Sequence, residues 1–246
     1  MNDKICLSVE NDEEIIWVCW FQGMEKAPDI VKICYRELLL KANRPVRLIT
    51  EENFSEYVDL PNYIVCKYRE GIIDRTHFSD ILRTALIYQH GGLWIDSTML
   101  LTKSIPEYIW EASIFVFKLR PPTFTWQCCS NQFIRARAGD KILGRTLCGL
   151  YAYWKINNHM ISYFFYHYIF AEAVRMSNDT HIAFDNIITM YSQDNHEMQS
   201  SLWNKFDKTQ WDLLLNKSFV HKLTYKNLRD TNSKDTVYWH IIHELE

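Results

Sequence analysis

The chain has 246 residues, and 48% of them are hydrophobic, which is enough to bury a large core in one domain over residues 1–246. The formal net charge is −3 and no run of basic residues occurs, so nucleic acid is not an expected partner. The seven cysteines include no C-x-x-C pair, which disfavours a disulfide framework or a zinc ribbon and predicts reduced thiols in the cytoplasm. The chain shows neither a secretory leader nor a run of about 18 uncharged apolar residues, so we expect no transmembrane helix.

The first half of the chain alternates apolar runs with helical patterns. Residues 15–21 form a continuous apolar run, which is typical of a buried strand in a parallel sheet. Residues 30–40 have a helical pattern, residues 45–50 indicate a second strand, and residues 62–65 a short extended piece. Strands and helices that alternate at this spacing predict a βαβ arrangement.

Residues 76–100 combine a helical apolar stripe, a pair of glycines and a short apolar strand with a few charged residues. Asp80 and Arg83 are three residues apart, so they are neighbours on the surface of a helix. Gly91 and Gly92 supply the positive φ that commonly ends a helix, and Asp96 follows a short apolar strand. Ligands of open α/β sheets bind at the carboxyl ends of the strands, so this block predicts a polar ligand site. The helix itself is predicted from an apolar stripe: Phe78, Ile81, Leu82, Ala85 and Leu86.

Simpler interpretations of these residues remain open. Asp80 and Arg83 could form only a surface ion pair, which contributes a few tenths of a kcal/mol. Asp96 could only cap the loop after its strand. Trp20 and Phe21 could simply complete the core of the first strand, although the turn that follows them opens onto the same edge as Asp96.

The second half of the chain predicts a further strand at residues 114–117 and a helix at residues 140–154. The aromatic residues 163–170 are expected to pack mainly in the core, although such rings can also stack on a ligand and could line a groove. Residues 182–201 are polar, and we expect them to be irregular and to form a mobile lid. Residues 219–225 then indicate a strand near the carboxyl end.

The block at residues 76–100 resembles the signature of the capsular polysaccharide synthesis proteins, relatives of the DXD-containing glycosyltransferases with a GT-A fold. The shared pattern is Ser-Asp-x-x-Arg on a helix, then Gly-Gly, an aromatic residue, and Asp-x-Asp or Asp-x-Thr; here it occupies residues 79–83, 91–92, 94 and 96–98. The resemblance implies an α/β, Rossmann-like fold. In it, helices flank a mostly parallel central sheet, and the C-terminal portion is helical.

The resemblance also implies a nucleotide-sugar donor, most simply a UDP-sugar. Asp80, Arg83 and Asp96 would hold the donor sugar and serve as the catalytic residues. Asn131 and Gln132 would border the sugar or the acceptor, although they could instead be turn amides. The implied contacts with the nucleotide and the rest of the donor are Trp20, Phe21, Gln22, Trp94, Ser97, Asn131, Gln132 and Lys222.

A divalent cation, Mn²⁺ or Mg²⁺, is the cofactor that the resemblance implies, held by Asp96, Thr98 and His221. Thr98 stands where the DXD pattern has its second aspartate, so an oxygen ligand is kept and a charge is lost. We therefore expect metal binding that is weaker, water-mediated or dependent on the diphosphate. Ser162 similarly stands where family members commonly have an acidic residue, and His221 could instead be a surface residue at the end of a strand.

Taken with the resemblance, the sequence predicts a retaining glycosyltransferase that moves a sugar onto a hydroxyl of a capsular or other surface polysaccharide. No convincing nucleophile emerges, so attack by the acceptor on the same face of the sugar is the default mechanism. If the acceptor glycan is lipid-linked, the cytoplasmic enzyme would reach the inner face of the membrane as a peripheral protein. Three alternatives remain: a nucleotide-sugar-binding protein without turnover, a metal-dependent hydrolase, and a scaffold of a polysaccharide assembly complex.

Overall fold

The protein is described here by a computed structural model, which covers residues 14–122, 126–229, 231 and 233–245. The amino-terminal residues on which the leader prediction rests lie outside this description. At the centre is a five-stranded sheet with the order β2-β1-β3-β6-β5. Its strands are β1 (Ile16–Cys19), β2 (Val46–Ile49), β3 (Gly92–Asp96), β5 (Ile114–Lys118) and β6 (Cys129–Ala136).

The direction of one strand makes this sheet mixed. β1 pairs in parallel with β2 and β3, whereas β6 is antiparallel to both β3 and β5. The strands β1, β2, β3 and β5 therefore share one direction, and β6 runs against them. The α/β architecture is confirmed, and the expected mostly parallel sheet contains one reversed strand.

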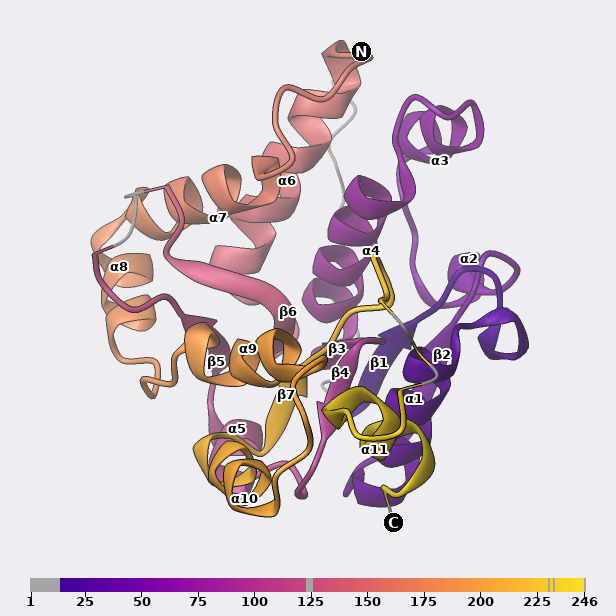
Figure 1. The fold of residues 1–246 in the computed structure, drawn as a ribbon. Coiled ribbons are helices and arrows are strands. Elements are labelled where there is room, and N and C mark those ends of the chain that lie inside the picture. The colour runs from indigo at the N-terminus through magenta and orange to yellow at the C-terminus, as the bar shows by residue number, and fades with distance from the viewer. Residues whose placement is uncertain (1–13, 123–125, 230, 232, 246) are drawn as a thin grey trace.

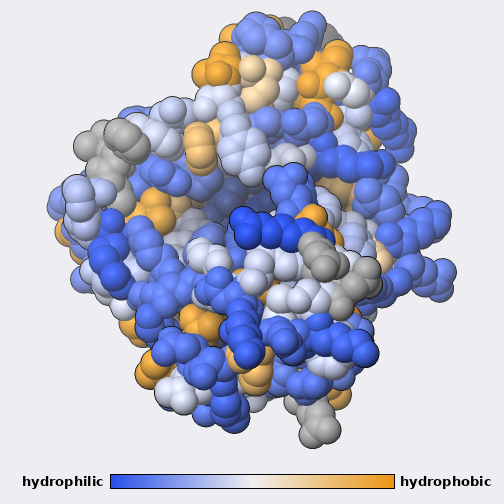
Figure 2. Space-filling model, viewed as in Figure 1, coloured by the Kyte–Doolittle hydropathy of each residue, from blue (hydrophilic) through white to orange (hydrophobic). Residues whose placement is uncertain are grey.

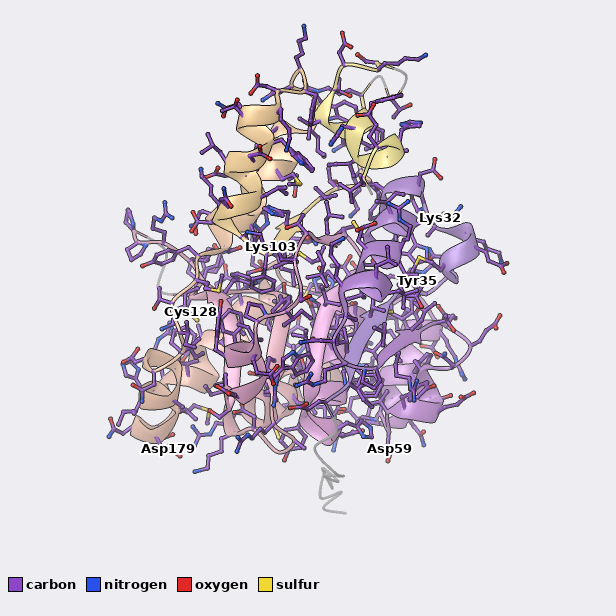
Figure 3. All side chains as sticks on the ribbon, turned by 90° about the horizontal axis from the view of Figure 1, so that it is seen from below. Lys32, Tyr35, Asp59, Lys103, Cys128 and Asp179 are labelled. Atoms are coloured by element: carbon purple, nitrogen blue, oxygen red, sulfur yellow. The ribbon has the colours of Figure 1, made fainter. Side chains whose placement is uncertain are left out.

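Helices cover both faces of the main sheet (Figure 1). α1 (Asp29–Lys41) connects β1 to β2, and α2 (Phe54–Tyr57), α3 (Asn62–Arg69) and α4 (Arg75–His90) lead from β2 to β3. These two connections move in opposite directions along the sheet, so right-handed crossovers put α1 and α4 on opposite faces. α6 (Lys141–Ile156) and α7 (Phe165–Arg175) pack on the α4 side. Figure 3 shows the strands side by side, with α1 next to them where Lys32 and Tyr35 are labelled.

A second, two-stranded sheet lies on the α1 side. It pairs β4 (Met99–Leu101) with β7 (Val220–Lys222) in antiparallel fashion, and α1 packs against β4 while α9 (Ser192–Ser201) packs against β7. α10 (Lys208–Lys217) and α11 (Val237–His243) complete a second apolar cluster with α1 and α9. The shorter elements are η1 (Met24–Lys26), α5 (Glu107–Glu111) and α8 (Asn178–Asp185). The C-terminal portion is thus helical, as predicted, and its packing brings β7 beside the end of β3.

The helix–glycine–strand block forms as the sequence predicts, for local reasons. Asp74 caps α4, because its Oδ1 accepts a hydrogen bond from the backbone N–H of His77 at 2.8 Å. Gly91, with φ of 70°, ends the helix. Gly92 has φ of 89°, and a Cβ there would lie 2.3 Å from the carbonyl oxygen of Ile15. The second glycine therefore allows β3 to approach β1 closely.

Two predictions of local structure are wrong. Residues 62–65 are the first turn of α3 and not an extended piece, because Ile64 and Tyr68 lie four residues apart and both face the core. Residues 182–201 are not irregular, since they contain the end of α8 and all of α9. α9 buries polar side chains such as Ser192 and Asn195, so its inward face does not show the apolar period of a helix.

None of the helices within the described ranges is long and apolar enough to cross a membrane.

Candidate functional site

A pocket opens at the carboxyl edge of the main sheet, between the start of α4 and the segment after β7. Its volume is about 340 Å³, and Figure 2 shows the hollow near the middle of the face toward the reader. Cys19 of β1 is in register with Asp96 of β3, which places the turn after β1 beside the end of β3. A pocket at this block argues against the scaffold alternative. The predicted site residues that line it are Trp20, Phe21, Gln22, Arg83, Trp94, Asp96, Ser97, Thr98 and Lys222.

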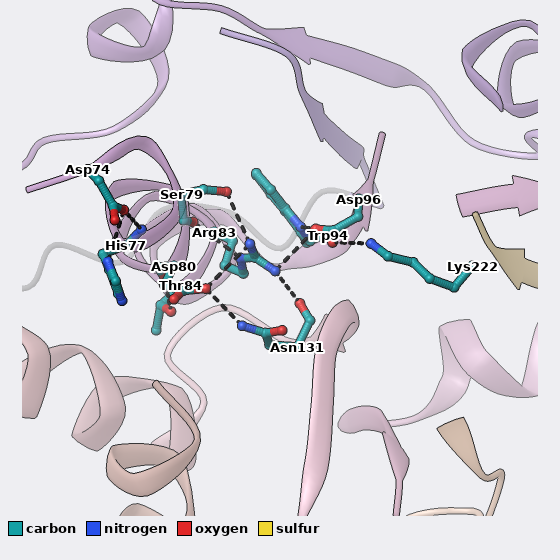
Figure 4. A network of polar contacts seen from close by, with 10 residues as sticks. All are labelled: Asp74, His77, Ser79, Asp80, Arg83, Thr84, Trp94, Asp96, Asn131 and Lys222. Atoms are coloured by element: carbon teal, nitrogen blue, oxygen red, sulfur yellow. Dashed lines mark hydrogen bonds and ion pairs between the residues drawn. The ribbon is translucent and has the colours of Figure 1, made fainter. Parts of the chain in front are cut away.

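Arg83 is fixed at the wall of this pocket by contacts from three elements (Figure 4). Its Nη1 donates to the backbone oxygen of Asn131 at 2.6 Å and lies 3.1 Å from Oδ1 of Asp96. Its Nη2 donates to Oγ of Ser79 at 3.1 Å. The guanidinium also lies over the ring of Trp94, 5.1 Å from the centroid, and Nε1 of Trp94 donates to Oδ1 of Asp96 at 2.9 Å. Nε of Arg83 donates to the backbone oxygen of Ser79 at 3.2 Å, so every N–H of the buried guanidinium faces a protein acceptor, and Arg83 acts on the pocket through its charge and by holding Asp96.

Lys222 joins the small sheet to the main sheet through Asp96. Its Nζ lies 2.9 Å from Oδ2 of Asp96, across 126 positions in the chain. Burial alone would raise the pKa of Asp96, but Lys222 and Arg83 together hold that pKa below its ordinary value. Asp96 is therefore ionised at neutral pH, and both of its oxygens contact protein donors.

Asp80 lies behind Arg83 and does not line the pocket. It is 5% exposed; its Oδ1 accepts from Nδ2 of Asn131 at 2.8 Å and lies 3.4 Å from Nη2 of Arg83. Burial raises the pKa of Asp80 to about 6, against the opposing effects of Arg83 and His77. The expected direct contact of Asp80 with a sugar is not supported, because Asp80 is not among the described residues that line the pocket and contacts Asn131 and Arg83 instead.

Asn131 and Gln132 occupy neighbouring positions on β6 and point in opposite directions. The Asn131 side chain reaches Asp80, whereas Nε2 of Gln132 donates to Oδ1 of Asn195 in α9 at 2.9 Å. Side chains alternate between the faces of a strand, so both cannot face one site. Gln132 is therefore placed away from the pocket, contrary to expectation, and Asn131 reaches it only through the Asp80–Arg83 pair.

The residues expected to hold a divalent cation do not converge. His221 alternates with Lys222 on β7, so it faces away from Asp96; it is fully buried, and burial lowers its pKa to about 4. Thr98 lines the pocket, but its backbone oxygen accepts from the N–H of Leu223 at 2.8 Å. In the ranges that the structure describes, no three His, Cys, Asp or Glu residues are grouped to hold a metal ion. The expected ligand set of Asp96, Thr98 and His221 does not fit, and a metal-dependent hydrolase has no ligand cluster in those ranges.

The basic residues Arg75 and Lys226 line the pocket but were not predicted from the sequence, and Tyr163 lines it from the aromatic segment that was expected to pack mainly in the core. Arg75, Ser79 and Arg83 are four residues apart along α4, so one face of this helix carries them all into the pocket. That spacing was a signal in the sequence. Tyr163 and Lys226 lie on connecting segments, where no period indicates the direction of a side chain.

Two curated fungal proteins are similar to part of the chain. An O-glycosyltransferase braB of Annulohypoxylon truncatum is 25% identical over 155 residues, which cover 54% of this chain and 35% of that protein. An O-glycosyltransferase PaGT of Phomopsis amygdali is 25% identical over 130 residues, with 45% and 32% covered. The match therefore spans about a third of the length of either relative.

The fold and the sequence were also compared with solved structures and with protein families. A structure described as PaToxG Glycosyltransferase aligns with a TM-score of 0.48 at 13% identity and covers 94% of this chain and 86% of that one. A structure described only as a transferase has a TM-score of 0.37 at 11% identity, with 75% and 92% covered. Residues 2–241 match the capsular polysaccharide synthesis proteins, and the chain belongs to that family.

Proposed function

We propose that this protein is a glycosyltransferase that moves a sugar from a nucleotide-diphosphate donor, most simply a UDP-sugar, to a hydroxyl of a surface glycan. The observation that carries this proposal is the chain of contacts from Arg83 through Asp96 to Lys222 in one pocket at the carboxyl edge of the sheet. Such a pocket offers an ionised carboxylate for sugar hydroxyls and cations for phosphates. The names of the similar fungal proteins agree with this activity.

The lining of the pocket supports one orientation of the donor. Lys222 and the other basic side chains suit the diphosphate, and Asp96, which Arg83 holds in place, suits the hydroxyls of the sugar. Trp20, with Phe21 and Gln22 beside it at the end of β1, suits the nucleoside, since an indole can stack on a base. Trp94 and Ser97 would lie near the ribose. Asp80 and Asn131 then hold Arg83 in place and do not contact the donor.

The chemistry requires one bond to form and one to break at the anomeric carbon. The bond from that carbon to the β-phosphate oxygen breaks, and the oxygen keeps the electron pair. The acceptor hydroxyl forms the new bond and loses its proton, for which the departing phosphate oxygen is the nearest base under a same-face attack. Fixed donors that neutralise the developing charge on the diphosphate lower the barrier by several kcal/mol. Retention of the anomeric configuration follows from this geometry of attack.

A row of aromatic rings beside the pocket, two of them exposed and two half-buried, suits the acceptor. Tyr163 lines the pocket and is 66% exposed, and its ring centroid lies 5.3 Å from that of Phe164. Trp126 lies 5.4 Å from Phe164 and 4.7 Å from Tyr168. Exposed rings are suited to stack on the apolar face of a pyranose. The acceptor would thus be a glycan, free or lipid-linked, that approaches over Tyr163.

Thermal stability with a panel of UDP-, GDP- and TDP-sugars tests the function, because a ligand that binds only the folded state raises the melting temperature. We expect one nucleotide-sugar to stabilise the protein and to be hydrolysed slowly to the free sugar. Asp96→Asn should abolish both effects. Asp212→Asn, a carboxylate on the exposed face of α10, is the matched control. If no nucleotide-sugar raises the melting temperature, the proposal is wrong.

A binding protein without turnover is the second candidate. Thr98 in place of a second aspartate, and Ser162 where relatives commonly have an acidic residue, favour it. It predicts a rise in melting temperature with one nucleotide-sugar but neither transfer nor hydrolysis. The same panel, followed by a measurement of released nucleoside diphosphate, separates the two candidates.

A further inference from the structure

We infer that the diphosphate of the donor is neutralised by side chains of the protein, with Lys222 in the place of a divalent cation, so that donor binding and turnover need no metal. This inference rests on the proposed function, since it concerns the same pocket. It replaces the expectation of Mn²⁺ or Mg²⁺ and assigns Arg75 and Lys226 to the diphosphate.

The first step of the argument is that both oxygens of Asp96 are engaged. Oδ1 accepts from Nε1 of Trp94 at 2.9 Å and lies 3.1 Å from Nη1 of Arg83. Oδ2 lies 2.9 Å from Nζ of Lys222. Mg²⁺ binds a carboxylate oxygen at about 2.1 Å, so an ion at Oδ2 would lie close to the ammonium of Lys222 and the guanidinium of Arg83, and both would repel it.

The second step is that no other side chain in the part of the chain that the structure describes completes a metal site at this position. Mg²⁺ and Mn²⁺ prefer several oxygen ligands, usually with more than one carboxylate or with substrate phosphates. Among the described residues that line the pocket, Asp96 is the one carboxylate. His221 faces away on β7, and Thr98 offers a neutral hydroxyl that is 7% exposed.

The third step is the balance of charge. The lining residues include four basic side chains, Arg75, Arg83, Lys222 and Lys226, against the carboxylate of Asp96, which leaves a surplus of three positive charges. Asp80 also contacts Arg83, and including its carboxylate in the count leaves a surplus of two positive charges. The diphosphate of a nucleotide-sugar carries about two negative charges and the released nucleoside diphosphate about three, because the pKa of a terminal phosphate is near 6. The protein therefore supplies a charge of matching size without an added ion.

The fourth step is that Lys222 can contact Asp96 and a phosphate oxygen at the same time. An ammonium has three N–H donors, so it can keep Asp96 and bind a phosphate oxygen at once. Its side chain is 20% exposed and lies in the pocket wall. Arg75, in the first turn of α4, and Lys226, after β7, also line the pocket and carry positive charge on long side chains.

Calorimetric titration with UDP and with inorganic pyrophosphate, each in EDTA and in Mn²⁺, tests the inference. We expect dissociation constants that agree within about threefold between the two conditions, and donor hydrolysis that proceeds in EDTA. Lys222→Met should weaken the binding of UDP and pyrophosphate by about tenfold or more, and Lys222→Arg should restore most of it. Lys226→Met and Arg75→Met should each weaken binding by a smaller factor. Lys208→Met, on the exposed face of α10, is the matched control.

The outcomes separate this inference from the proposed function. Binding of UDP or pyrophosphate that disappears in EDTA and returns with Mn²⁺ would overturn the inference and leave the glycosyltransferase in place. Equal binding by the wild type and Lys222→Met, with both variants folded by thermal unfolding, would also overturn it. If GDP, TDP, UDP and pyrophosphate all fail to bind under either condition, both the inference and the proposed function are wrong.

Discussion

Oδ1 of Asp80 lies 3.4 Å from Nη2 of Arg83, and both side chains are more than nine-tenths buried. Arg83 also contacts Asp96 at 3.1 Å, so one guanidinium is shared by two carboxylates. The interpretation of Asp80 and Arg83 as a surface ion pair is therefore wrong. Because these charges are buried, removing one of them leaves the others without a compensating charge. The resulting loss in the free energy of unfolding can be measured.

Arg83→Ala should lower the free energy of unfolding by about 3–5 kcal/mol, because it leaves two carboxylates without their shared cation in a buried site. Urea denaturation measures the effect. Lys141→Ala is the matched control, since Lys141 pairs with Asp179 on the surface of the protein, and it should cost less than about 1 kcal/mol. Equal losses in the two variants would show that the buried contacts of Arg83 do not contribute to stability.

The pKa of Asp80, raised to about 6, predicts how stability depends on pH. Between the ordinary pKa of 3.8 and about 6, the folded state binds more protons than the unfolded state, so this contribution is present at low pH and is lost as pH rises. Asp80→Asn cannot ionise. Relative to the wild type, this variant should therefore gain stability from pH 4.5 to pH 7, by about 2 kcal/mol. Urea denaturation at several pH values measures the difference, and a difference that does not change with pH would contradict the raised pKa.

The sequence was informative where a period or a glycine determines the structure. The stripe from Phe78 to Leu86 and the pair Gly91 and Gly92 predict α4, its end and β3, because the helical period and the positive φ are local properties. Arg75 was missed although it shares the α4 face of Ser79 and Arg83. The polar inward face of α9 could not be predicted, because its partner Gln132 comes from a distant strand.

The sequence did not show which face of its strand each site residue occupies. Side chains on a strand alternate between its two faces, so neighbouring residues face opposite ways. A shift of one residue in the pairing of two strands would turn each side chain to the other face. Asn131 and Lys222 face the site, while Gln132 and His221 face away. Which member of each pair faces the site depends on the pairing of β6 with β3 and of β7 with β4, which are distant in the chain.

Asn131→Ala should therefore weaken donor binding, whereas Gln132→Ala should affect only stability. Asn131→Ala removes the hydrogen bond to Asp80, so the position of Arg83 should change and the dissociation constant for the donor should rise by about tenfold. Gln132→Ala should leave donor binding unchanged and lower stability by about 1–3 kcal/mol, because Asn195 is left buried without this partner. Calorimetric titration and urea denaturation of both variants check the contrast. Loss of donor affinity in Gln132→Ala would show that Gln132 acts on the pocket after all.

Tyr163→Ala should weaken acceptor binding and leave donor binding unchanged. Saturation-transfer-difference NMR with methyl β-D-glucopyranoside and methyl β-D-galactopyranoside, in the presence of UDP, measures contact of pyranose C–H groups with the protein. The signal should fall by about fivefold in the variant, which corresponds to roughly 1 kcal/mol from one stacked ring. Tyr108→Ala is the control, because Tyr108 is 40% exposed and does not line the pocket. Unchanged signals in Tyr163→Ala would argue that the aromatic row binds something other than a glycan.

Gly92→Ala tests the contact by which β3 lies against β1. The new Cβ would lie 2.3 Å from the carbonyl oxygen of Ile15, a backbone atom that cannot move without disturbing β1, and φ of 89° is strained for alanine. We expect a loss of about 3 kcal/mol or more in the free energy of unfolding, and weaker donor binding because Asp96 ends this strand. Gly71→Ala separates the two causes, since φ is 75° there but no atom lies within 4 Å of the added Cβ. Gly71→Ala should lower the free energy of unfolding by only about 1 kcal/mol, which is the effect of the backbone conformation alone. Equal losses in the two variants would mean that β1 moves to accommodate the added methyl group. The close approach of β3 to β1 at Gly92 would then not be required for stability or for the position of Asp96.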